Sequence, residues 1–201
     1  MDKVLLVEGK DDLFVFSDIF EKHKVVQSFE IIDKVGVTSL LKSIPIHVKT
    51  DISSIGIVID ADSDIEKRWV SLKSILSKIG YNVPDKPNSL GTILYKKDLP
   101  DFGVWIMPNN NENGMLEDFV KYLIPENDKI MPFVERTLLR LESENLNKYK
   151  NIHKSKAEIH TWLAWQKTPG TPMGLAITKT YLETGSEMCL SFVNWINKLF
   201  N

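Results

Sequence analysis

Two stretches of sequence, VLLVEGKDD at residues 4–12 and GIVIDADSD at residues 56–64, decide the fold. Each is a short apolar run, rich in β-branched residues, that ends in a group of carboxylates. Continuous apolar runs of this length are typical of strands that are covered on both faces of a parallel sheet. In such sheets, ligands bind beyond the carboxyl ends of the strands. The two acidic groups therefore predict a binding site at one edge of an α/β sheet.

Strand-like and helix-like segments alternate through the first half of the chain. The pattern predicts strands at 3–7, 29–33 and 55–60, and helices at 11–22, 37–44 and 64–79. In the helical segments, apolar residues recur every three or four positions. Such alternation indicates βαβ units and a mostly parallel sheet. Right-handed crossovers would bring the ends of the first and third strands to the same edge.

The second half of the chain is a turn-rich segment followed by helices. We expect the runs at 92–95 and 102–107 to form a hairpin or a further strand pair at the edge of the sheet. Helices are expected at 115–123, 128–145, 152–166 and 186–200, with a rigid connector at 168–172. We therefore predict an α/β domain over residues 1–124, with a helical C-terminal extension over residues 125–201 packed on it.

The composition is that of a globular protein, and it gives no general case for nucleic-acid binding. The formal net charge of the 201 residues is -2, so binding to nucleic acid would need local basic patches or metal-bridged phosphates. The single cysteine, Cys189, excludes an internal disulfide and a cysteine-based zinc site. Because no apolar stretch approaches the roughly 20 residues of a membrane span, and the N-terminus lacks a secretory pattern, we expect a cytoplasmic protein without a membrane partner.

The carboxylates at the two strand ends are the candidate metal ligands. Glu8 precedes a glycine that lets the backbone turn sharply, and Asp12 follows Glu8 by four residues. Asp60 and Asp62 project to the same side if the backbone stays extended. Like charges this close repel one another. A hard divalent cation with oxygen ligands offsets that repulsion, which suggests Mg²⁺ or Mn²⁺.

Several of these acidic residues also have a plainer interpretation. Asp11 and Asp12 fit helix capping and a favourable interaction with the helix dipole. Asp64 fits the N-cap of the next helix better than it fits a metal ligand. Glu117, in the first turn of a later helix, fits a dipole-favoured helix start as well as it fits a carboxylate for a second metal. The alternative for residues 60–64 as a whole is a solvated acidic loop.

Glu8-Gly9 with Asp12, followed after a βα unit and a strand by Asp60-Ala61-Asp62, resembles the paired motifs of Toprim domains. These domains occur in primases, topoisomerases, recombination mediators and OLD-family nucleases. The resemblance covers roughly the first half of the chain and implies a Toprim-like sheet in which Glu8 acts as acid/base or metal ligand and the two aspartates coordinate Mg²⁺. Residues 107–118 and 153–165 are similar to small stand-alone Toprim-like proteins, some of them related to the OLD nucleases.

A second group of candidate residues is basic. Lys154 and Lys156 lie in the densest basic cluster of the C-terminal half, and Lys10 lies beside Glu8. Such residues would neutralise phosphate charge beside the metals. The alternatives are a solvated helix face for the two C-terminal lysines and an exposed turn for Lys10.

Together these patterns favour a metal-dependent phosphoryl-transfer enzyme that acts on nucleic acid, DNA rather than RNA, and a Toprim-type nuclease in particular. The expected catalytic residues are Glu8, Asp60 and Asp62; the expected metal ligands are these three with Asp12, Asp64 and Glu117; and the expected substrate-binding residues are Lys10, Lys154 and Lys156. Two alternatives stay open: a regulatory module that binds metal and nucleic acid or nucleotide without cutting, and a response-regulator-like domain. The OLD nucleases carry an ATPase and this chain has no Walker motif, so a partner ATPase in trans and an oligomer are also left open.

Overall fold

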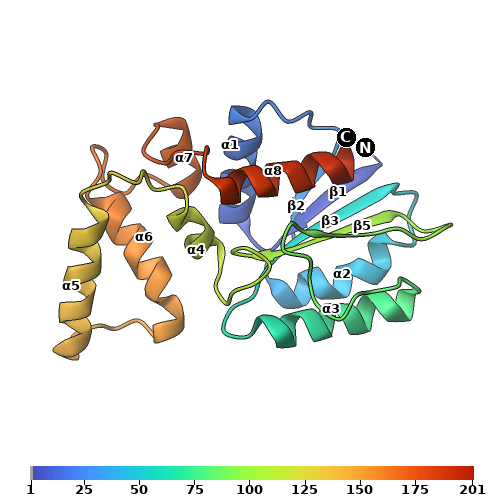
Figure 1. Ribbon diagram of the computed structural model, residues 1–201, viewed down its shortest axis with the longest axis horizontal. Coiled ribbons are helices and arrows are strands. Elements are labelled where there is room, and N and C mark those ends of the chain that lie inside the picture. The colour runs from blue at the N-terminus through green and yellow to red at the C-terminus, as the bar shows by residue number, and fades with distance from the viewer. Residues whose placement is uncertain (1) are drawn as a thin grey trace.

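The computed structural model describes residues 2–201, and its centre is a sheet of five strands (Figure 1). The strand order is β2-β1-β3-β5-β4. Four strands are parallel: β1 (Lys3–Val7), β2 (Glu30–Asp33), β3 (Ser54–Asp60) and β5 (Asp101–Met107). The short edge strand β4 (Thr92–Leu94) pairs with β5 in the antiparallel direction. The predicted α/β fold with a mostly parallel sheet is therefore confirmed.

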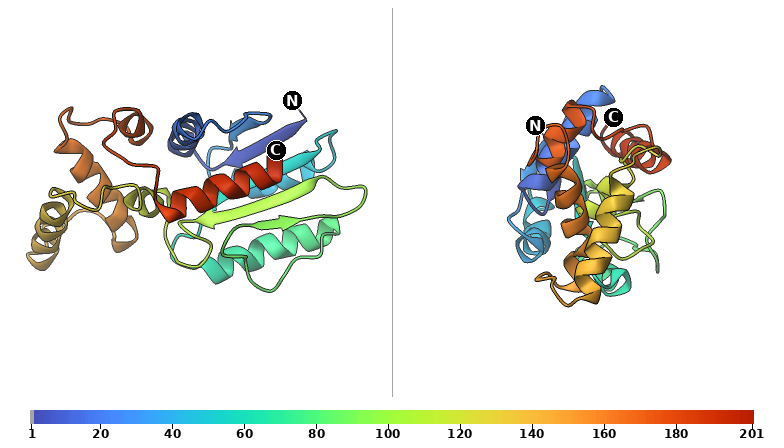
Figure 2. Two further views of the ribbon diagram at one scale, coloured as in Figure 1. Left: turned by 45° about the horizontal axis from the view of Figure 1, so that its top comes forward. Right: turned by 90° about the vertical axis from the view of Figure 1, so that its left-hand side faces the viewer.

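Helices cover both faces of the sheet (Figures 1 and 2). One face carries α1 (Lys10–Lys22) and α8 (Glu187–Phe200), and the other carries α2 (Val37–His47) and α3 (Ile65–Ile79). Side chains alternate along β1 accordingly: Leu5 packs with the α1 and α8 side chains, whereas Leu6 packs with those of α2 and α3. Burial on both faces explains why the strands are continuous apolar runs.

α8 lies close against the sheet because the strands beneath it carry glycines. A Cβ atom on Gly103 would lie 2.3 Å from Leu199 Cδ2 and 2.9 Å from Trp195 Cζ2, and one on Gly56 would lie 2.9 Å from Phe200 Cζ. The end of α8 is also tied to the first strand, since Lys3 Nζ donates a hydrogen bond to the carbonyl of Phe200. The last helix is thus a full layer of the α/β fold.

The remaining helices lie beyond the carboxyl edge of the sheet or return to α1 (Figure 2). They are α4 (Leu116–Lys121), α5 (Met131–Ser143), the 3₁₀ turn η1 (Asn151–His153), α6 (Lys154–Ala164) and α7 (Met173–Thr178). α5 and α6 pack against each other, α4 contacts α6, and α7 packs on α1. Within residues 2–201, no helix combines the length and the apolar character that crossing a membrane requires.

The helix ends differ from the sequence prediction where side chains or tertiary contacts decide them. α5 begins at Met131 instead of 128, because the Asp128 carboxylate accepts hydrogen bonds from the amides of Ile130 and Met131. α2 continues to His47, past Pro45. α7 was not predicted, since its six residues are too few to show a helical period. In the segment after residue 124, α5 and α6 project from the sheet, whereas α7 and α8 return to the α1 side of it.

Gly103→Ala is expected to lower the free energy of unfolding by about 1–3 kcal/mol, because its Cβ would overpack the contact with α8. Urea unfolding followed by circular dichroism measures the change. Gly185→Ala is the matched control, since a Cβ atom there would meet nothing within 4 Å. An unchanged midpoint for Gly103→Ala would contradict the close contact between α8 and β5.

Candidate functional site

The ends of β1 and β3 meet at the carboxyl edge of the sheet. The two strands are parallel neighbours, with Leu6 opposite Ile57. Glu8 follows β1 directly and Asp60 is the last residue of β3. The amide of Asp60 donates a 2.8 Å hydrogen bond to Glu8 Oε1, so one carboxylate is fixed against the backbone that carries the other. The shared edge that the βαβ pattern predicts is therefore present.

Asp12 joins this edge from the first turn of α1. Its Oδ2 accepts a 3.0 Å hydrogen bond from the amide of Gly9, which caps the helix as the sequence suggested. The side chain is nevertheless only 8% exposed. Burial, together with the charges of Glu8 and Glu117, raises the pKa of Asp12 from 3.8 to about 7. A capping role alone does not explain why a carboxylate is placed where burial and neighbouring negative charges disfavour its ionised form.

Asp60 carries a buried carboxylate oxygen at this edge. Its Oδ1 atom has no hydrogen-bond partner within residues 2–201. Burial raises the pKa of Asp60 well above its ordinary value, and the charges of Glu8, Asp12 and Glu117 add to the rise. A buried acceptor without a donor costs free energy, and such an atom in a native fold calls for a ligand or a proton.

Glu117 comes from a different part of the chain, the first turn of α4, and is buried. Its charge raises the pKa values of Asp12 and Asp60, so it lies within electrostatic range of both. Glu117 Oε1 lies 3.2 Å from Lys156 Nζ. Glu8, Asp12, Asp60 and Glu117 are called the acidic cluster below. Three separate segments supply it: the β1–α1 junction, the end of β3, and α4.

Asp62 and Asp64 are arranged differently from the acidic cluster. The backbone does not stay extended to Asp62, whose φ of 54° is left-handed, because its amide and carbonyl both bond to Gly114. The Asp62 carboxylate pairs with Arg68 Nη2 at 2.6 Å, and Arg68 Nε donates to the carbonyl of Asp60 at 2.7 Å. Asp64 accepts from the amide of Lys67 and is the N-cap of α3. The assumption of an extended strand through Asp62 was thus wrong.

The basic candidates also separate. Lys156 lies at the acidic cluster: burial would lower the pKa of its ammonium, but the charges of Glu117, Asp11 and Asp60 raise it overall. Lys154 instead pairs with Glu142 of α5 at 2.8 Å. Lys10 is exposed at the start of α1. Of the predicted substrate-binding lysines, the fold brings Lys156 alone into contact with a carboxylate of the cluster.

Two interactions at the site were missed from the sequence. Arg68 clamps Asp62 to the end of β3 from the second turn of α3. Ser155 Oγ donates to the Asp118 carboxylate, which also caps α4 through the amide of Met115, so the first turn of α6 is fastened beside the cluster. The spacing of Arg68, one helical turn after Asp64, was a usable signal, whereas the contact of Ser155 spans 37 positions.

The carboxylates are the oxygen donors that Mg²⁺ and Mn²⁺ prefer. In the arrangement described, however, no three His, Cys, Asp or Glu side chains of residues 2–201 are already gathered as ligands. Glu8 Oε1 is held by an amide, Asp62 by Arg68 and Glu117 by Lys156. The unpartnered Oδ1 of Asp60 and the hard donor set fit a divalent cation, which would have to compete with these internal partners.

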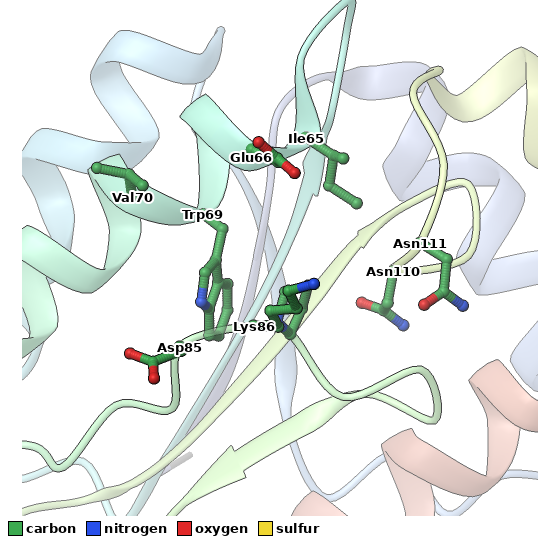
Figure 3. A pocket seen from close by; sticks show the side chains of 9 residues that line it. Ile65, Glu66, Trp69, Val70, Asp85, Lys86, Asn110 and Asn111 are labelled. Atoms are coloured by element: carbon green, nitrogen blue, oxygen red, sulfur yellow. The ribbon is translucent and has the colours of Figure 1, made fainter.

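A cavity of about 440 Å³ opens on the other side of the first turn of α3 (Figure 3). Trp69, Lys86 and Asn110 contribute to its wall, but none of the acidic cluster does. The indole of Trp69 donates to the carbonyl of Pro84, and Asn110 Oδ1 accepts from the amide of Ile106. These polar groups hold the loops together. The cavity is separate from the acidic cluster, because no residue of the cluster lines it.

The sequence matches one known family along almost its entire length. The family is described as a protein of unknown function (DUF3226), and the match spans residues 2–201. No curated protein matches the chain. No solved structure matches it.

The buried state of Asp12 predicts a pH dependence of stability. Its pKa rises on folding from 3.8 to about 7, so its contribution is fully present below pH 3.8 and is lost as the pH rises toward 7. Asp12→Asn cannot ionise and keeps an acceptor for the amide of Gly9. In metal-free buffer, we expect a smaller loss of stability for this variant than for the unmodified chain between pH 4 and 7.

Urea midpoints measured across this pH range test the prediction. Asp11→Asn removes a neighbouring carboxylate that is exposed, and it should leave the pH profile unchanged. An identical decline in the Asp12→Asn and Asp11→Asn proteins would show that burial of Asp12 does not govern the profile.

Proposed function

The chain belongs to the DUF3226 family, a family of unknown function, and we propose from the acidic cluster that it is a divalent-metal-dependent phosphodiester hydrolase. The proposed enzyme is a nuclease of the Toprim type, and its substrate is nucleic acid. The order Glu8-Gly9 before Asp60-Ala61-Asp62, at the ends of adjacent parallel strands, supports this type. Mg²⁺ or Mn²⁺ is the proposed cofactor.

One observation carries the proposal: the charges of Glu8, Asp12 and Glu117 all act on Asp60 at the sheet edge, and Asp60 keeps a buried oxygen without a donor. Burying carboxylates together is unfavourable unless they are protonated or share a cation. A purely structural group of this kind would weaken the fold, and its members would be better replaced by apolar residues. A divalent cation bound during function is a reason for them to persist.

The side chains divide the work as follows. Glu8, Asp12, Asp60 and Glu117 would hold the cation, and Asp62 would join them on release from Arg68. The cation would polarise a phosphodiester and favour ionisation of the attacking water. Glu8 Oε1 is engaged by the amide of Asp60, so Oε2 is the atom that would take a proton. Lys156 pairs with Glu117 and lies at the acidic cluster, so its ammonium would be the group to pair with a phosphate oxygen if Glu117 held the cation.

A second candidate function is a regulatory module that binds metal and nucleic acid or nucleotide without cutting. The ion pairs of Arg68 with Asp62 and of Lys156 with Glu117 favour this function, because they neutralise two carboxylates without a metal ion. Both functions require metal binding, so turnover on DNA, RNA and nucleotide substrates separates them.

Asp60→Asn is expected to lower the Mn²⁺-dependent cleavage of oligonucleotides by at least about 100-fold, since even an outer-shell partner of a bound metal is worth 10–100-fold. Cleavage rates of proteins purified in parallel provide the measurement. Asp98→Asn, an exposed substitution in the turn between β4 and β5, is the control and should cleave at the unmodified rate. Equal rates for Asp60→Asn and the unmodified chain would reject the proposed function.

Metal binding can be tested without turnover. At pH 8, Mn²⁺ should raise the Tm of the unmodified chain, because a ligand that binds the folded state alone stabilises it by mass action. At about 100 times Kd, the gain is about 2.7 kcal/mol. The shift should vanish in Asp60→Asn and persist in Asp98→Asn. A metal-dependent shift of the same size in all three proteins would place the cation elsewhere.

A further inference from the structure

The connection between α5 and α6 is a basic segment next to the acidic cluster. Residues 145–157 read NLNKYKNIHKSKA and contain four lysines and a histidine but no Asp or Glu. The part before α6, residues 145–153, is called the basic turn below. The chain as a whole has a formal charge of -2, so this segment departs from the average character of the protein.

The shape of the basic turn is fixed by one carboxylate. Glu142 Oε1 accepts from the hydroxyl of Tyr149, and Glu142 Oε2 accepts from Lys154 Nζ, both at 2.8 Å. Asn147 Nδ2 donates to the carbonyl of Tyr149. Both oxygens of Glu142 are thereby occupied, Glu144 pairs with Arg140, and Lys154 serves to hold the turn in place.

Three basic side chains of the basic turn have no acidic partner within residues 2–201. Lys148, Lys150 and His153 are exposed, and none of them has a carboxylate within ion-pair distance in residues 2–201. Lys154 and Lys156 differ, since both are paired. The exposed side chains are therefore available to an anionic partner, and no rearrangement of the fold is needed to release them.

The basic turn is held next to the acidic cluster by the first turn of α6. Ser155 bonds to Asp118 and Lys156 pairs with Glu117. His153 precedes Lys156 by three residues, about one helical turn or 5 Å along the axis. Lys148, Lys150 and His153 thus precede Lys156 along the connection between α5 and α6, whose course Figure 1 shows.

We propose that the basic turn binds the sugar-phosphate backbone of a nucleic-acid strand whose scissile phosphate lies at the acidic cluster. The inference rests on the proposed function and deepens it, since it makes the substrate a polymer that spans several phosphates. Unpaired basic side chains that lead up to Lys156 offer contacts to the repeated charge of such a backbone, whereas a small phosphodiester would reach the acidic cluster alone. Binding by the turn is independent of base sequence, because phosphates carry none.

The test uses the double variant Lys148→Ala/Lys150→Ala in the full-length chain. Binding of a fluorescein-labelled oligonucleotide is measured by anisotropy in EDTA at a series of salt concentrations. The variant should bind more weakly, and the slope of log K against log salt should be shallower by about 1.4 for a single strand to 1.8 for a duplex, since each phosphate contact contributes about 0.7 to 0.9.

Lys96→Ala/Lys97→Ala is the matched control. These two lysines are exposed, as Lys148 and Lys150 are. They lie in the turn before β5, at the opposite edge of the sheet from the acidic cluster. The control should bind with the unmodified affinity and slope. Mn²⁺-dependent hydrolysis of bis(p-nitrophenyl) phosphate, a small diester, should be the same in both variants, because the basic turn does not touch the reacting atoms.

The outcomes separate the inference from the proposed function. Unchanged affinity and slope in Lys148→Ala/Lys150→Ala would overturn the inference, even if the chain cleaves DNA or the small diester. Loss of affinity in this variant but not in the control supports the inference, even if no cleavage of any substrate is found. Absence of oligonucleotide binding by the unmodified chain would also overturn it.

Discussion

β1 and β3 lie side by side in parallel, and this pairing forces the carboxylates of Glu8 and Asp60 into one place. Because both strands are buried on both faces, their ends can turn in few directions. The amide of Asp60, the last residue of β3, donates to Glu8, which fixes the two strand ends to each other. Asp12 and Glu117 then approach a region that already carries negative charge. Most of the electrostatics of the site follow from this arrangement.

The protein moderates that charge with two cations of its own. Arg68 reaches Asp62 and the backbone of Asp60 from α3, and Lys156 reaches Glu117 from α6. The two cations come from different parts of the fold. Arg68 lies on α3, which covers one face of the sheet, and Lys156 lies on α6, one of the two projecting helices. Binding a metal ion would therefore exchange internal ion pairs for external ones. Through that exchange, the helices that carry Arg68 and Lys156 would take part in metal binding.

Local patterns were enough to predict the sheet and the meeting of its strand ends. Apolar periodicity located the strands, and the handedness of βαβ units placed Glu8 near Asp60 without a template. The conformation of Asp62 could not be predicted in this way, since it depends on hydrogen bonds to Gly114, far along the chain. The pairing of Lys156 with Glu117 was also beyond reach, because it depends on how α4 packs against α6. Sequence patterns report what neighbours along the chain do, and these contacts join segments tens of residues apart.

The position of α8 has a consequence for how the site comes into being. This helix covers the same face of the sheet as α1, and its side chains fill the space above Gly56 and Gly103. β1 and β3 precede α8 in the chain, so their α8 face stays open to water during synthesis until α8 itself has been made. The sheet therefore gains this part of its cover late, long after the segments that supply Glu8 and Asp60 have left the ribosome.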